Sequence, residues 1–418
     1  MTQTLEIGIN EGERERNRHN ALGVVNELHP RFDELRERGD VHRGNMAELF
    51  GVASSGPSLL MRRSDSHFTV LGYETADAAF RRHEVFSSRV YEETVMTWGP
   101  NLLSMDEPEH RRYRMLAQPA FANKTMQDWE SRWLVPILDR LIEGLAHAER
   151  ADLYMGYCAL FPAHTICSSF GIGESDVAPM HDWLLRMLNT SDPEDAARAG
   201  RSFAEYMGRV VRERRADPND DVISLLANSE LVDEDGSRHQ LTDDEIMGFA
   251  GLMLTAGSGT TYRSLGIMLL TLLQRPALLE KVVSDRSLVP QVIEETLRWD
   301  PPLTYFSRLA TRDTELDGVP MPKGTVVDLS VTAANHDPRR WEDPHEFDPF
   351  RPTQPHMGFG SGPHFCIGNQ LARMELRVAL NRLLDAFPRM QLDPEAPEPF
   401  VTGLYFRMPT AVPVILNP

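Results

Sequence analysis

The segment Phe359-Gly360-Ser361-Gly362-Pro363-His364-Phe365-Cys366-Ile367-Gly368 places a single cysteine in a glycine-rich loop. An amphipathic stretch follows and predicts a helix from Asn369 to about Phe387. Unpaired N–H groups at a helix N-terminus favour negative charge, so this position predicts a lowered pKa for the Cys366 thiol and a reactive thiolate. The glycines of the loop allow the backbone to approach a large, flat partner closely.

The cysteine pattern limits which metal centre the loop can hold. Zinc cages and iron–sulfur clusters need several ligands, and no second cysteine lies near Cys366 in the sequence. Cys158 and Cys167 fall in an apolar helical run, and we expect them to be inert core residues. One thiolate fits a single axial bond to haem iron, which we expect to be the role of Cys366.

The composition predicts a soluble globular protein. The chain has 418 residues, of which 41% are hydrophobic and 25% charged. It contains no run of about 18 apolar residues that could span a membrane, and no apolar segment of a secretory signal. Three cysteines suggest a reducing compartment, so the expected location is cytoplasmic. A net charge of −19 disfavours nucleic acid and anionic membrane surfaces as partners.

Helical periodicity dominates the chain. Helices are expected at about 29–37, 76–82, 109–121, 123–146, 153–170, 175–188, 193–215, 222–227, 242–274, 277–283, 289–299 and 370–387. Strands are expected near 59–61, 68–71, 314–316, 319–321, 325–329 and at the C-terminus. The predicted fold class is therefore mainly α with a small β region, preceded by a disordered tail at residues 1–20.

The longest predicted helix begins with a capping box, Thr242-Asp243-Asp244-Glu245. About 32 residues give a length of about 48 Å, enough to cross a whole domain, and the nearly continuous apolar surface predicts burial. Its middle, residues 255–261, nevertheless contains two glycines, each costing about 1 kcal/mol relative to alanine. This break in a strong helical pattern indicates a functional site, with close helix packing at small residues as the alternative.

Phe359, Gly362, Cys366 and Gly368 match the haem-binding signature of the cytochrome P450 family in spacing and order. From about Glu27 onward the chain resembles that family. The resemblance implies the cytochrome P450 fold, with haem b between a long distal helix and a proximal helix that follows the cysteine loop. It also implies that the chain after the tail, residues 21–418, is a single haem-thiolate monooxygenase domain.

The middle of the long helix, Ala256-Gly257 followed by Thr260, resembles the oxygen-binding groove of the family. Thr260 matches the threonine whose hydroxyl holds water beside the bound oxygen, and a hydroxyl with an ordered water can relay protons. The preceding residue is usually Asp or Glu in the family and is Gly259 here. Protons could then come through water in the glycine gap, another side chain or the substrate. Tyr262 and Arg263 are expected to turn partly away from position 259.

Two further groups of residues match family positions that hold haem or the loop beneath it. Haem carries two propionates, which need cations or hydrogen-bond donors. The residues expected to bind them are His110, Arg114, Arg308 and His364. The E-x-x-R pair, Glu295 and Arg298, is expected to form a structural clamp with Arg351.

The resemblance implies a monooxygenase that inserts one atom of O2 into a C–H bond. No flavin or nicotinamide domain fits in the sequence, so electrons are expected to come from elsewhere; the resemblance implies a ferredoxin and its reductase, with NAD(P)H as the ultimate donor. Arg111, Arg112 and Arg373 are expected to dock the acidic ferredoxin. Two alternatives remain: a peroxygenase driven by hydrogen peroxide, because the acid at 259 is missing, and a non-catalytic haem sensor or carrier.

Family positions place the substrate pocket along residues 90–103, 248–260, 303–306 and 404–406. These segments are largely apolar and include Trp98, Tyr305 and Phe306. They suggest a small to medium lipophilic substrate, such as a terpenoid, steroid, fatty acid or aromatic molecule. A metal site formed by His336, His345 and His356 is disfavoured by their irregular spacing across prolines, so exposed or structural histidines are expected.

Overall fold

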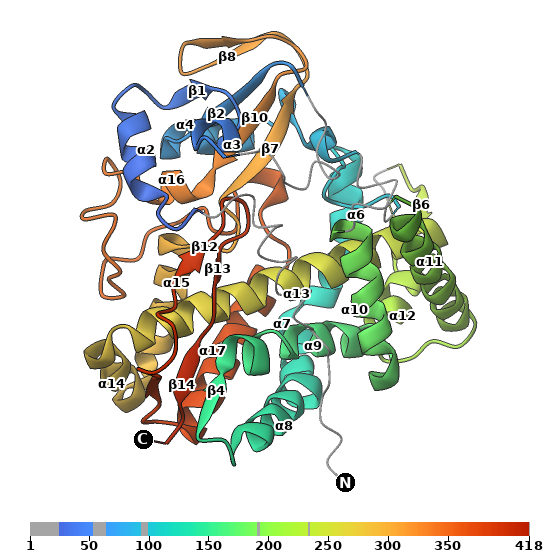
Figure 1. Ribbon diagram of the computed structural model, residues 1–418. Helices are drawn as coiled ribbons and strands as arrows, with labels where there is room; N and C mark the ends of the chain where they lie inside the picture. The colour runs from blue at the N-terminus through green and yellow to red at the C-terminus, as the bar shows by residue number, and fades with distance from the viewer. Residues whose placement is uncertain (1–24, 53–63, 93–98, 190–192, 233–234, 418) are drawn as a thin grey trace.

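The computed structural model describes residues 25–52, 64–92, 99–189, 193–232 and 235–417. The expected tail at 1–20 and the expected strand at 59–61 lie outside these residues. A strand-rich part forms the top of the molecule in Figure 1 and helices form most of the rest, with α13 (Asp243–Leu273) crossing the middle. The prediction of a mainly α fold with a small β region is confirmed.

The main sheet has five strands in the order β1-β2-β10-β7-β3. At its centre, β10 (Val326–Ser330) runs parallel to β2 (His67–Val70) and antiparallel to β7 (Tyr305–Ala310). Every residue of β10 is buried, and its register with β7 sets Arg308 opposite Val327. The outer strands are β1 (Val41–Arg43) and β3 (Phe86–Ser87).

The other strands form a three-stranded sheet and three pairs. The three-stranded sheet joins β4 (Arg150–Asp152), β14 (Pro413–Ile415) and β11 (Gln391–Leu392). The pairs are β5 (Glu230–Val232) with β6 (Arg238–Gln240), β8 (Thr314–Leu316) with β9 (Val319–Met321), and β12 (Val401–Thr402) with β13 (Met408–Pro409). The strands predicted at 68–71, 314–316, 319–321 and 325–329 are confirmed to within one residue.

Helices make up most of the described chain. Besides α13 they are α2 (His29–Arg36), α3 (Met46–Leu49), α4 (Tyr73–Arg81), α6 (Glu109–Ala117), α7 (Asn123–Trp129), α8 (Val135–Leu145), α9 (Phe161–Ser169), α10 (Glu174–Asn189), α11 (Pro193–Ala216), α12 (Val222–Asn228), α14 (Pro276–Ser284), α15 (Val289–Trp299), α16 (Val331–Asn335) and α17 (Asn369–Ala386). Short 3-10 turns are η1 (Ser88–Tyr91), η2 (Gln118–Phe121), η5 (Arg286–Leu288) and η6 (Gly362–His364).

The long helix α13 follows its prediction closely. Thr242 Oγ1 accepts a hydrogen bond from the Glu245 N–H at 3.3 Å, and the Glu245 carboxylate accepts one from the Thr242 N–H at 2.7 Å, so the capping box is present. The helix continues without a break through the two glycines and ends just before Pro276. Its buried length forms part of the largest core of the described chain.

Two helices predicted as continuous are divided. The stretch expected at 123–146 contains a π-helical turn, η3 (Glu130–Leu134), and the stretch at 153–170 begins with another, η4 (Tyr154–Cys158). The next α-helix has a proline in its first two positions in both cases, Pro136 in α8 and Pro162 in α9. Proline has no N–H to donate to the preceding turn, so a regular α-helix cannot run through it unchanged.

Candidate active site

The cysteine loop is closed by hydrogen bonds of its own backbone. The Cys366 N–H donates to Phe359 O at 3.0 Å, and the Phe365 N–H donates to Gly362 O at 3.0 Å. The Asn369 side-chain amide donates to Cys366 O at 2.8 Å at the start of α17. The loop therefore holds the thiol at a fixed place directly before the helix.

Two glycines of this loop adopt backbone angles that other residues rarely take. Gly360 has a φ of 73° and Gly362 a φ of 69°. A Cβ on Gly362 would also lie 2.5 Å from Phe80 O, at the end of α4. Close packing of the loop against α4 therefore requires glycine at position 362.

The predicted lowering of the Cys366 pKa is wrong for the protein on its own. Burial raises the pKa of this thiol, and the Gly368 N–H, Arg114 and Arg373 oppose that effect without overcoming it. Desolvation of the buried thiol disfavours the thiolate more strongly than the helix N-terminus favours it. A bond to a metal ion deprotonates a thiol outright, so the thiolate state depends on the metal.

The four residues expected to bind propionates lie together beside this loop. The rings of His110 and His364 are 4.0 Å apart, and the His364 Nε2 lies 3.0 Å from the hydroxyl of Ser88. Burial lowers the pKa of His364 well below its ordinary value, and the charges of Arg308, His110 and Arg114 lower it further. Both imidazoles are therefore neutral near pH 7, because burial also lowers the pKa of His110.

The arginines of this group have no carboxylate partner among the described residues. Arg308 is 5% exposed, and its Nη1 donates to the carbonyl of Ser307 at 2.8 Å. Arg114 is half-buried in α6, and burial lowers its pKa. A buried cation without a counter-charge is costly, so this cluster suits a ligand that brings carboxylates. These residues fit a haem: Cys366 would hold its iron, and this cluster would hold its propionates.

The E-x-x-R pair forms a buried clamp with Arg351. Glu295 and Arg298 in α15 make two hydrogen bonds of 2.8 Å, and Arg351 Nε donates to Glu295 Oε1 at 3.0 Å. The remaining donors of Arg298 reach the carbonyls of Asn335 and Pro344, each at 2.9 Å. The clamp thus ties α15 to the proline-rich segment that leads into the cysteine loop.

The middle of α13 differs from the rest of this helix in exposure. Ala256 is exposed and Thr260 half-buried, whereas the turns on both sides are mostly buried. The Thr260 hydroxyl donates to Ala256 O at 2.9 Å.

The expectation that Arg263 turns partly away from position 259 is wrong. Four residues make about one helical turn, so Arg263 lies over position 259, and its Nη1 donates to Gly259 O at 2.7 Å. A Cβ on Gly259 would lie 3.0 Å from this nitrogen, so the gap is filled by guanidinium.

Comparisons with known proteins agree with this arrangement. A family model described as cytochrome P450 matches residues 173–411. Cytochrome P450 107B1 of Saccharopolyspora erythraea is 35% identical over 295 residues, 70% of this chain and 71% of that protein. The monooxygenase PikC of Streptomyces venezuelae is 31% identical over 392 residues, covering 90% of this chain and 89% of PikC.

The chain belongs to the cytochrome P450 family. A crystal structure of CYP109E1 from Bacillus megaterium in complex with corticosterone has a TM-score of 0.78 and 27% identity, covering 96% of this chain and 100% of that chain. This P450 is therefore a monooxygenase whose cofactor is haem b, and it requires O2 and redox partners. Among the described residues, no helix is long and apolar enough to cross a membrane.

One buried acid near the distal helix was missed in the sequence. Glu375 in α17 is 3% exposed, and the hydroxyl of Thr261, the residue after Thr260, is near enough to act on its pKa. Burial raises its pKa to about 8, so this carboxyl is largely protonated near pH 7. The signal was present: Glu375 falls on the apolar face of α17, between Leu371 and Val378.

The predicted pocket segments contribute unequally. Tyr305 and Tyr405 are buried against each other, with ring centres 4.9 Å apart, in a core that includes α2. Within segments 303–306 and 404–406, the half-buried side chains are Leu303, Phe306 and Phe406. A β-bridge joins Leu303 to Phe406. The predicted pocket role of Tyr305 is therefore not supported, because its strand turns it into the core. Trp98 lies outside the described residues.

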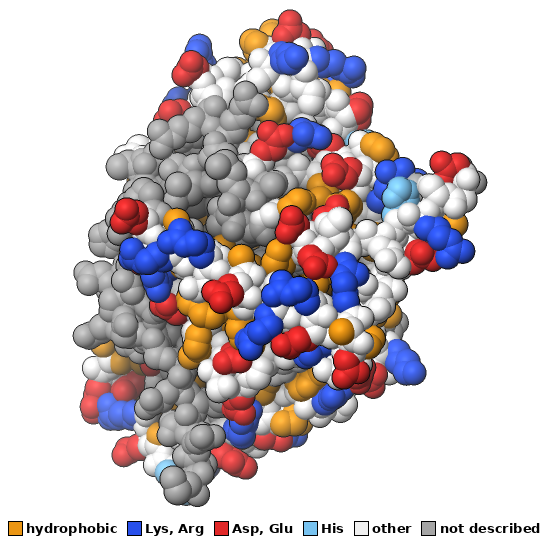
Figure 2. Space-filling model, turned by 90° about the vertical axis from the view of Figure 1, so that its right-hand side faces the viewer, with side chains coloured by type: hydrophobic (Ala, Val, Ile, Leu, Met, Phe, Trp, Pro, Cys, Tyr) orange, Lys and Arg blue, Asp and Glu red, His pale blue; other side chains and the backbone are white. Residues whose placement is uncertain are grey.

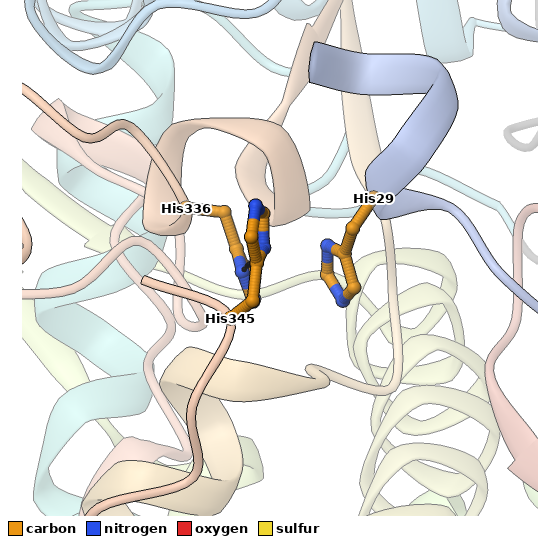
Figure 3. Close-up of side chains that lie close together, drawn as sticks. All are labelled: His29, His336 and His345. Atoms are coloured by element: carbon orange, nitrogen blue, oxygen red, sulfur yellow. Dashed lines mark hydrogen bonds between the residues drawn. The ribbon is translucent and has the colours of Figure 1, made fainter. Parts of the chain in front are cut away.

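The histidines considered as a metal site do not form one cluster. His336 and His345 lie beside His29 (Figure 3), while His356 Nε2 lies 3.3 Å from the carboxylate of Glu294. The rings of His29 and His336 are stacked with centres 3.9 Å apart, so the lone pairs in their ring planes do not converge on one point. His345 Nε2 donates to Asp33 at 2.8 Å. These contacts fit a role in packing α2 against the loop around His345.

The arginines expected to dock ferredoxin differ in their surroundings. Arg111 and Arg112 are exposed on α6, the helix that also carries Arg114. Arg373 instead makes two hydrogen bonds to Glu294, of 2.7 and 2.8 Å, so its charge is offset within the protein. Figure 2 shows acidic and basic side chains interspersed over the described part of the face in view.

Proposed function

We propose that this P450 inserts one oxygen atom of O2 into a C–H bond of a small to medium lipophilic substrate. The bound haem supplies oxygen activation and transfer. The observation that carries the proposal is the pairing of the fixed Cys366 loop with a distal helix whose middle, around Ala256 and Thr260, is less buried than the turns on both sides. The chain's part is to bind the haem by Cys366 and the basic cluster, and to exclude water around the reacting atoms.

Proton supply on the distal side is assigned to Thr260. Its hydroxyl donates to Ala256 O and keeps its lone pairs free to accept a hydrogen bond from water. Gly259 has no side-chain proton to give, and the space beside it is filled by the guanidinium of Arg263. Glu375, largely protonated near pH 7 and beside Thr261, is a reserve of protons on the neighbouring helix α17.

The substrate is held by apolar contact. Leu303 lies just before β7, Phe306 lies in β7, and Phe406 lies in the hairpin between β12 and β13; their side chains offer aromatic and aliphatic surface without a hydrogen-bonding group. Such a surface favours a lipophilic skeleton such as a terpenoid, steroid, fatty acid or aromatic molecule. The bound corticosterone of the CYP109E1 structure is one example of this class in a structural neighbour.

Electrons are expected from a ferredoxin and its reductase, docked beside Arg111 and Arg112. Their helix, α6, also carries Arg114, whose charge acts on Cys366, so a partner bound there is close to the haem ligand. Steering by charge weakens with salt, because the screening length falls to about 8 Å near physiological ionic strength. Arg112→Glu should slow electron transfer at low salt, and a rate independent of both salt and this change would contradict the docking site.

The experiment that tests the function compares two oxidant systems. Steady product formation with NAD(P)H, reductase and ferredoxin, but not with hydrogen peroxide alone, is the expected result. Turnover with peroxide alone would identify a peroxygenase, which the missing acid at position 259 keeps as the second candidate. Absence of product with both systems, across a panel of substrates that shift the haem absorption band, would indicate a sensor or carrier.

A further inference from the structure

Arg263 is a buried cation on the distal helix that the proposed chemistry does not use. It is 8% exposed, and its Nη1 donates to Gly259 O at 2.7 Å. The guanidinium carbon lies 4.6 Å from the ring centre of Tyr262 and 4.5 Å from that of Phe406. Arg263 thus lies between the helix that carries Thr260 and the hairpin that carries Phe406.

The charge of Arg263 lacks a counter-charge within the described part of the chain. Its Nε is buried without a hydrogen-bond partner, and no described carboxylate lies within 4.0 Å. Other deeply buried arginines are paired: Arg298 with Glu295 at 2.8 Å, and Arg407 with Asp300 at 2.9 Å. The exception besides Arg263 is Arg308, which belongs to the cluster assigned to the haem propionates. Cation–π contact with two rings offsets only part of the cost of burying a charge.

We propose that Arg263 binds a carboxylate of the substrate, so that the preferred substrates are lipophilic acids. The inference rests on the proposed function, because the acid is part of the molecule that is oxidised. With Nη1 bound to Gly259, the Nε side of the guanidinium is the edge left for a ligand. That edge presents two parallel N–H groups, which match the two oxygens of a carboxylate. Phe406 beside it would cover the adjoining carbon chain.

This arrangement explains why glycine suits position 259. An aspartate there would start its side chain 3.0 Å from Arg263 Nη1 and form an ion pair over one helical turn. That internal carboxylate would take the place of the substrate's. The departure from the usual acid at 259 and the unpaired arginine at 263 are therefore two halves of one site, because glycine keeps the guanidinium available.

The test measures binding of matched neutral and charged ligands to the haem-loaded protein. A panel of straight-chain and aryl carboxylic acids, each beside its own methyl ester, is titrated by calorimetry and by the shift of the haem absorption band at pH 7.5. The parent should bind the best acid at least tenfold more tightly than its ester. Arg263→Leu should abolish that preference and leave ester affinity within about twofold, since the apolar contacts remain.

Two further variants separate a binding role from a structural one. Gly259→Asp keeps the arginine but should also abolish the acid preference, because it supplies an internal partner. Arg209→Leu is the matched control: Arg209 also lies over a tyrosine ring, 5.0 Å from Tyr206, but on α11. It should keep the parent's preference. Equal weakening of acid and ester in Arg263→Leu, or an unchanged preference in both Arg263→Leu and Gly259→Asp, would overturn the proposal.

Failure of this inference would differ from failure of the proposed function. A parent that binds and oxidises esters as well as acids contradicts the carboxylate site and leaves the monooxygenase standing. A protein that oxidises nothing in either oxidant system removes the basis of both.

Discussion

Replacing Glu295 with glutamine removes one negative charge from the buried clamp and keeps its shape. The carboxylate accepts hydrogen bonds from Nε and Nη2 of Arg298, each at 2.8 Å. It also accepts hydrogen bonds from Arg351 Nε at 3.0 Å and from the Asp348 N–H at 2.8 Å. The side chains of Glu295 and Arg298 are only 3% and 2% exposed. The amide nitrogen of glutamine would face an arginine donor, so at least one of these bonds is lost and the cation stays buried.

The size of the effect follows from this geometry. Breaking a buried ion pair from one side costs about 3–5 kcal/mol, and glutamine's remaining oxygen places the variant near the lower end, at about 3 kcal/mol. The unfolding entropy of about 2.1 cal/mol/K per residue gives about 0.9 kcal/mol/K for a chain of this length. The expected fall in Tm is therefore about 3–4 °C.

The assay is denaturant unfolding and thermal melting of the haem-loaded protein. The control is Glu230→Gln, which breaks the Arg238–Glu230 pair of 2.6 Å between side chains that are 69% and 32% exposed. An exposed pair of this kind contributes less than about 1 kcal/mol. If Glu295→Gln destabilised the protein no more than Glu230→Gln, the clamp would not have the energetic role that its burial implies.

Three other substitutions test separate parts of the structure. Glu375→Gln should flatten a loss of stability between pH 5 and 8: the folded pKa of about 8 exceeds the ordinary 4.5, so the parent's stability is full below pH 4.5 and falls by about 3.5 kcal/mol between pH 5 and 8. Identical pH profiles of unfolding would contradict the burial of a protonated carboxyl. His29→Gln should flatten the acid side: burial lowers the pKa of His29 from 6.5 to about 3, so the parent loses about 2 kcal/mol between pH 7 and 5 that the variant keeps, with exposed His147→Gln as control. Equal acid sensitivity of parent and His29→Gln would refute this. Thr260→Ala should keep haem and substrate binding but divert reducing equivalents to peroxide, measured as product and peroxide formed per NAD(P)H; unchanged coupling would move the proton route elsewhere.

The fold was predictable where one local signal dominates. The capping box at Thr242 and Pro276 fixed the ends of α13, because side-chain caps and a missing N–H act within one turn. The clamp partners of Glu295 were found from family position, and the structure brings them within hydrogen-bond distance. The π-helical turns before Pro136 and Pro162 were not found, since periodicity alone does not distinguish them from α-helix.

The site was harder to predict where burial decides the chemistry. The pKa of Cys366 depends on desolvation by residues distant in sequence, which outweighs the nearby helix N-terminus. The contact of Arg263 with Gly259 follows from the four-residue spacing of a helix, but the absence of a described carboxylate near its guanidinium appears only in three dimensions. The rings of His29 and His336 stack because segments about 300 residues apart pack together, and a local sequence pattern does not predict such a contact.

The absorption spectrum of the reduced carbon monoxide complex tests the central claim most directly. The claim is that Cys366, and neither of the buried Cys158 and Cys167, is the axial ligand of the haem iron. The haem-loaded parent, Cys158→Ala and Cys167→Ala should all show the band characteristic of thiolate ligation. Cys366→His, which can still bind iron, should bind haem with the band moved to the position typical of imidazole ligation. A thiolate band that persists in Cys366→His would contradict the account.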